Sequence, residues 1–191
     1  DFIGAVTVTG GATTLKDAND LTVTLTTSGA TDLTAVDTLT VDGTVSGATS
    51  DLTTAAAATI FGATTVGRNL SVIASGTVSD TAKLSVAGIT TISAIGQSVE
   101  LDTATNDFIG AVTVTGGVTT LKDANDLTVS VTTSGATDLT AVDTLIVDGA
   151  VSGATSDLTT TAAATSFGAT TVGQNLSVTA SGTVSDTAKL A

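Results

Sequence analysis

The chain has 191 residues and a formal net charge of −13, and it contains no Pro, Cys, Met, Trp, Tyr or His. Because such an acidic chain repels nucleic acid and anionic lipid, we expect neither as a partner. Without His and Cys, catalytic triads and zinc sites that need those side chains are excluded, and no apolar stretch is long enough to predict a membrane span.

Short segments with alternating apolar and polar residues follow one another from the N-terminus. Thr alone supplies 45 residues, and β-branched side chains favour strands over helices. Alternation with period two is typical of a half-buried strand and is clearest in segments 21–26, 39–42 and 70–72. The residues that we expect to point inward are Leu21, Val23, Leu25, Leu39, Val41, Leu70 and Val72. Those expected to point outward are Thr22, Thr24 and Thr40.

Glycines mark the expected turns between these segments. They are Gly11, Gly29, Gly47, Gly76, Gly96, Gly117, Gly135, Gly153 and Gly182. The first five steps between them are 18, 18, 29, 20 and 21 residues, which predicts about five coils of 18–21 residues. The 29-residue step includes residues 53–58, TTAAAA, which we expect to form a loop or a longer side of one coil.

The second part of the chain repeats the first. Residues 107–191 match residues 1–85 with ten differences, which defines a first repeat at 1–106 and a second, incomplete repeat at 107–191. We interpret the chain as one continuous stack cut from a longer array. Its open ends are then expected to stack on other copies, because neither carries a polar cap.

Two all-β architectures fit a repeat of 106 residues. The first is a parallel β-solenoid, in which each coil stacks on the next. The second is a pair of tandem immunoglobulin-like β-sandwiches. The solenoid is favoured because the copies join without a linker at Asn106-Asp107, the side chains are small for a two-sheet sandwich core, and the turn spacing recurs within each copy.

Three segments resemble a known family: 84–91 (LSVAGITT), 99–108 (VELDTATNDF) and 121–129 (LKDANDLTV). They are similar to repeats of giant filamentous-haemagglutinin-like surface proteins of Gram-negative bacteria. The resemblance implies a right-handed parallel β-helix in a long secreted adhesin or surface filament.

The function expected from this resemblance and from the composition is structural. The chain would be a stiff, acidic spacer outside a bacterial cell, with further copies of itself as partners. The alternative is an adhesive module that binds carbohydrate or another cell through repeated Thr and Asp faces.

Candidate chemistry is limited to carboxylates. The pairs Asp17/Asp20 and Asp37/Asp42, with their copies Asp123/Asp126 and Asp143/Asp148, could act in polysaccharide cleavage. We predict no enzyme activity, because Asp suits turns and a site duplicated in every repeat suits structure. We expect no cofactor; calcium is the one alternative, with Asp17, Asp20, Asp123 and Asp126 as its candidate ligands. The alternative is that Asn19, Asn69, Asn106 and Asn125 lie at coil corners and bond to backbone or stack in ladders.

Overall fold

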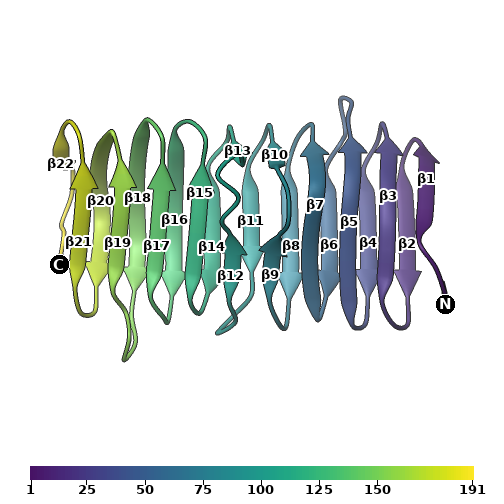
Figure 1. Ribbon diagram of the computed structural model, residues 1–191, viewed down its shortest axis with the longest axis horizontal. Helices are drawn as coiled ribbons and strands as arrows, with labels where there is room; N and C mark the ends of the chain where they lie inside the picture. The colour runs from purple at the N-terminus through teal and green to yellow at the C-terminus, as the bar shows by residue number, and fades with distance from the viewer.

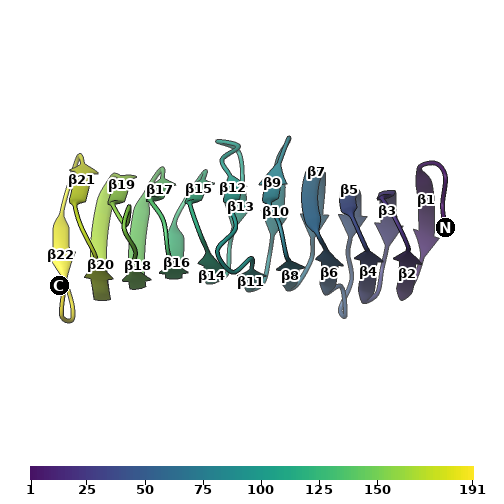
Figure 2. The same cartoon turned by 90° about the horizontal axis from the view of Figure 1, so that it is seen from below.

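A computed structural model describes all 191 residues and contains strands, turns and no helix. The strands form two sheets in which every pairing is parallel, and each coil contributes one side to each sheet. Figures 1 and 2 show the two layers side by side along one axis, with the N- and C-termini at opposite ends. The fold is therefore a parallel β-solenoid, as predicted, and the sandwich alternative is wrong.

The first layer, sheet A, has 12 strands. They are β1 (Val6–Gly10), β3 (Leu21–Thr27), β5 (Thr38–Val45), β7 (Ala58–Val66), β9 (Val78–Asp80), β10 (Leu84–Val86), β12 (Val99–Leu101), β13 (Asp107–Phe108), β15 (Thr119–Asp123), β17 (Thr137–Ala141), β19 (Leu158–Ala162) and β21 (Leu176–Ala180).

The second layer, sheet B, has 10 strands. They are β2 (Thr13–Asp17), β4 (Thr31–Ala35), β6 (Leu52–Ala56), β8 (Leu70–Ala74), β11 (Thr90–Ser93), β14 (Val112–Gly116), β16 (Leu127–Thr133), β18 (Thr144–Val151), β20 (Ala164–Val172) and β22 (Val184–Asp186).

A thin aliphatic core fills the space between the sheets. All seven side chains predicted to point inward are at most 1% exposed. Thr22 and Thr24 are exposed and Thr40 is half-buried, so the predicted parity is confirmed. Three Phe side chains add bulk to this core: Phe61, Phe108 and Phe167, each at most 1% exposed.

The ten differences between the copies follow the same inside–outside division. Only Leu25, which is Val131 in the second copy, lies at a buried position in both copies. The other nine differences lie at exposed or half-buried positions. The interior is thus almost identical in the two copies, as close packing requires.

Equivalent strands of the two copies lie in opposite sheets. β1 belongs to sheet A, whereas its copy β14 belongs to sheet B, and the same exchange holds for every later pair. From β1 up to β14 the chain passes through eleven sides of coils, counting β9 with β10 and β12 with β13 as one side each. A repeat therefore makes five and a half coils.

The glycine spacing suggested about five coils because each of the five steps between glycines was counted as one coil. The predicted turn glycines all lie between strands, but the 29-residue step spans one and a half coils. It runs from the corner at Gly47 past the corner at Ala57, which joins β6 to β7, and the corner at Gly67, which joins β7 to β8, to the corner at Gly76. Residues 53–58 thus comprise most of β6, the tight corner at Ala57 and the first residue of β7, and they do not form a loop.

Several Thr hydroxyls lie in the core without a hydrogen-bond partner. The Oγ1 atoms concerned belong to Thr54, Thr59, Thr90, Thr160 and Thr165. Thr59 is typical, because in its lane it stacks between Leu39 and Val78. A buried hydroxyl without a partner costs free energy, so these positions weaken the core.

We expect Thr59→Val to raise the free energy of unfolding by about 1 kcal/mol, because Val has the same shape without the unpaired hydroxyl. Thr64→Val, in the same strand, is the matched control. The Thr64 Oγ1 atom donates to the Val41 carbonyl at 2.8 Å in a buried position, so this change should destabilise by about 1 kcal/mol. Denaturant unfolding measures both, and a loss of stability in Thr59→Val would contradict the prediction.

Candidate functional site

Polar side chains at the coil corners bond to the backbone of the following coil. The Asp20 carboxylate accepts a hydrogen bond from the Thr38 N–H at 2.8 Å, and the copy Asp126 does the same with the Thr144 N–H at 2.8 Å. Further contacts of this kind are Asp51 with the Asn69 N–H, Asn69 with the Ile89 N–H, and Asp157 with the Asn175 N–H. These side chains replace the ladder hydrogen bonds that the corners interrupt.

A denser polar network lies where the first repeat meets the second. Asp80 accepts hydrogen bonds from the Asp102 N–H and from the Asn106 side-chain amide. The Asn106 Oδ1 atom in turn accepts from the Leu84 N–H at 2.8 Å. The Lys83 Nζ atom lies 3.3 Å from a carboxylate oxygen of Asp107. The irregular segment 102–106 is therefore tied to the preceding coil by side chains.

The Asn residues singled out from the sequence take part in these contacts. Asn69 and Asn106 accept backbone N–H groups, whereas Asn19 and Asn125 donate to Asp1 and Asp107 across one coil. The prediction of corner positions is therefore confirmed for Asn19, Asn69 and Asn125, whereas Asn106 lies within one side of a coil, between β12 and β13.

Asp17 and its copy Asp123 are the most buried of the candidate ligands, at 5% and 2% exposed. The Asp17 carboxylate accepts the N–H groups of Phe2 and Asn19, at 2.8 and 2.9 Å. Asp123 accepts those of Phe108 and Asn125, at 2.8 and 2.7 Å. Both carboxylates fix the chain that enters the coil and the corner that leaves it.

Although the two sites have the same hydrogen bonds, the pKa values of Asp17 and Asp123 are shifted in opposite directions. The N–H groups of Asn19 and Phe2 lower the pKa of Asp17 below its usual value of 3.8. Burial raises the pKa of Asp123, although the N–H groups of Phe108 and Asn125 oppose that rise. The difference arises because preceding coils cover Asp123, whereas Asp17 lies in the first coil.

The two carboxyls should therefore titrate in a fixed order. Asp17 stabilises the fold above pH 3.8, and this contribution is lost as the pH falls through its lowered pKa. Ionised Asp123 opposes folding above its raised pKa, and this penalty disappears as the pH falls toward 3.8. Carboxyl ¹³C NMR titration should give the higher midpoint for Asp123. The opposite order would contradict the assignment of burial as the dominant cause.

The structure does not bring the candidate carboxylates together as a metal or catalytic centre. No group of three or more Asp, Glu, His or Cys side chains is placed to hold a metal ion. Asp42 and Asp148 instead accept the N–H groups of Ala63 and Ala169, at 2.9 and 2.8 Å. These bonds secure a bulge in each copy, which the sequence did not reveal.

We expect thermal stability to change little when a chelator replaces millimolar calcium. The candidate ligands Asp17, Asp20, Asp123 and Asp126 already accept backbone N–H groups, so an ion would compete with existing bonds. Differential scanning calorimetry with calcium and with EGTA tests this expectation, with magnesium as the control cation. A large fall of Tm on chelation would contradict this expectation and would show that these aspartates bind calcium.

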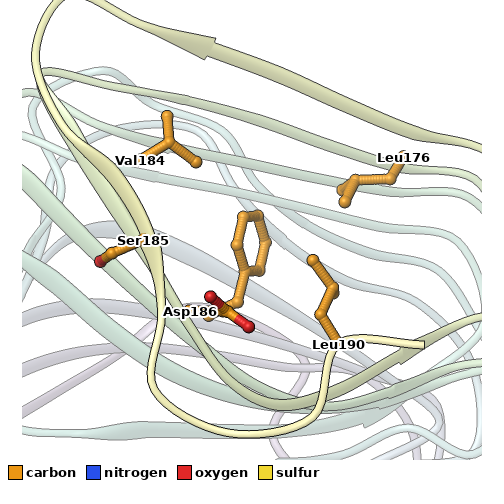
Figure 3. Close-up of a pocket in the computed structure, with 6 residues that line it drawn as sticks. Leu176, Val184, Ser185, Asp186 and Leu190 are labelled. Atoms are coloured by element: carbon orange, nitrogen blue, oxygen red, sulfur yellow. The ribbon is translucent and has the colours of Figure 1, made fainter.

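One hollow occurs in the molecule, at the C-terminal end of the core (Figure 3). Its lining residues are Phe167, Leu176, Val184, Ser185, Asp186 and Leu190. Leu176, Val184 and Leu190 are 38%, 53% and 37% exposed. Their equivalents in the first copy are at most 1% exposed, under the coil that follows them. The hollow is therefore an open end of the core and not a built ligand site.

The parallel sheets, the repeated corner contacts and the matched cores define a β-solenoid repeat protein. A family model described as "Repeats of unknown function (DUF5649)" matches residues 49–115 and 155–191. These ranges cover more than half of the chain, which therefore belongs to that family. Comparisons with curated proteins and with solved structures gave no match. The structure has no helix long and apolar enough to cross a membrane.

Proposed function

We propose that this chain is a stiff, acidic structural segment of a long extracellular filament or adhesin on a bacterial surface. The observation that carries the proposal is the continuity of both sheets through the repeat boundary. β11 pairs with β14, and β12 pairs with β15, across Asn106-Asp107. Because the second copy continues the coils of the first, addition of copies lengthens the molecule without a hinge.

Two further features support a mechanical role. The net charge of −13 discourages sideways aggregation of exposed sheets. Only one of the ten differences between the copies lies in the core. The side chains that hold the coils together are therefore almost the same in both copies, as a mechanical role requires. The resemblance to filamentous-haemagglutinin-like repeats supplies the extracellular bacterial setting of the proposal.

Immunogold electron microscopy tests this proposal. Antibodies raised against residues 1–191 should label thin filaments that extend from the surface of cells that encode the protein. Cells with the gene deleted are the control. Gold confined to the cell interior would contradict the proposed location.

Adhesion through the outward faces is the second candidate. It is favoured by the exposed Thr side chains of β3 and β16, which form similar rows on opposite sheets. A glycan array probed with the purified chain tests it, with Thr22→Ala/Thr24→Ala/Thr26→Ala and Thr128→Ala/Ser130→Ala/Thr132→Ala together as the matched variant. Binding that the variant loses would favour adhesion over a purely mechanical role.

A further inference from the structure

Each repeat has a long-stranded side and a short-stranded side. In the first copy, β5 and β7 in sheet A have 8 and 9 residues, whereas β6 and β8 in sheet B have 5 each. The register of β5 and β7 also shifts between Val41 and Gly43, and a bulge bends its strand. One repeat is thus lopsided across the solenoid axis.

The second copy places the same features on the other side. Its bulge, between Val147 and Gly149, lies in sheet B. In Figure 1, the tall corner loop that follows β5 rises at the top, and its copy after β18 extends at the bottom. These loops comprise residues 46–51 and 152–157.

We propose that the half-coil offset is a device that keeps a long array straight. Five and a half coils at about 4.8 Å relate successive repeats by a half-turn and a shift of about 26 Å. Any bend that one repeat imposes is then imposed in the opposite direction by the next. With a whole number of coils, the bends would add and the array would curve. This inference deepens the proposed mechanical function and rests on it.

The interior allows this exchange because either sheet accepts the same side chains. In β3, Leu21 and Val23 are fully buried from sheet A. Their copies Leu127 and Val129, in β16, are at most 1% exposed from sheet B. The offset also has an external consequence, since every outward feature recurs on one face only at every second repeat, about 53 Å apart.

The test uses the 191-residue chain lengthened by further copies of residues 86–191, which continue the repeat in phase. In the half-coil variant, residues 21–30 and their counterparts are duplicated in every repeat, which makes six coils. In the matched control, residues 21–38 are duplicated, which adds a whole coil and keeps the offset. Because the chain has no Cys, Thr22→Cys and its counterparts, introduced only in the first copy of each duplicated segment, give one label per repeat on the exposed surface.

Electron microscopy of the gold-labelled arrays shows on which side of the array each label lies and whether the array curves. The lengthened chain and the control should carry labels on alternate sides and have straight contours. The half-coil variant should carry all labels on one side and curve in a constant direction. One-sided labels on a contour as straight as that of the parent would overturn the proposal, as would a systematic curve in the parent itself.

A second variant guards against a duplication that does not fold. It duplicates residues 70–77, which comprise β8 and the corner that follows it, and so makes the same half-coil change elsewhere. Failure of immunogold labelling on cells would refute the extracellular location, whereas these measurements on purified arrays decide the geometry separately.

Discussion

Phe108→Ala is expected to destabilise the protein by about 3–5 kcal/mol, because it leaves a cavity between tightly packed coils. Phe108 is 1% exposed and stacks on Val86 of the preceding coil. The loss corresponds to a fall in Tm of roughly 6–20 °C for a chain of this size. Thermal unfolding measures the total effect.

The chain supplies its own control for this change. Phe2 occupies the equivalent position in the first copy but is 39% exposed. Its N–H bonds to Asp17 as that of Phe108 bonds to Asp123, so the backbone contact is matched. We expect Phe2→Ala to cost about 0.5 kcal/mol or less. Equal losses in the two variants would contradict a packing origin.

The effect of Phe108→Ala should also be local, since each coil contacts mainly its neighbours. Hydrogen exchange should accelerate first in β10, β12, β13 and β15, with β3 and β20 protected as before. Uniform loss of protection along the chain would indicate a single cooperative core, which a solenoid of this kind does not predict.

Gly43→Ala should destabilise the first copy by about 3 kcal/mol or more. Gly43 has φ +104°, a conformation that L-residues with a side chain rarely adopt. A Cβ atom there would also collide with the Leu25 carbonyl oxygen of the preceding coil. Because Gly43 adjoins the register shift between β5 and β7, hydrogen exchange in these strands should rise with the loss of stability.

Gly149→Ala repeats the experiment in the opposite sheet. Gly149 has φ +111°, and its Cβ would meet the Val131 carbonyl, so a similar loss is expected around β18 and β20. Gly10→Ala is the control, because no atom lies within 4 Å of the added Cβ. A Gly10 variant as unstable as the other two would show that glycine is needed for reasons other than φ and contact.

Alternation within short segments was sufficient to predict the class of fold and the core. In a strand, neighbouring side chains point to opposite faces, so the pattern LTVTLT at 21–26 assigns inside and outside without knowledge of any partner strand. The repeat, with only ten differences between the copies, then predicts that both copies form the same coils. Asp and Asn likewise marked corners, as Asn19 and Asn69 bear out.

The sequence determined by itself that the chain is an all-β repeat with an alternating core, and it favoured thin, parallel coils over tandem sandwiches, because side-chain alternation and repeat length are local properties. Only the tertiary structure decided which face each repeat presents, since the step from Gly47 to Gly76 covers three sides of coils whereas the other glycine steps cover two. It also decided that Asp17 and Asp123, in identical local sequences, have pKa values shifted in opposite directions. The burial of a side chain in a solenoid depends on the neighbouring coils, which lie about 20 residues away in either direction. A local sequence pattern does not show whether those coils are present.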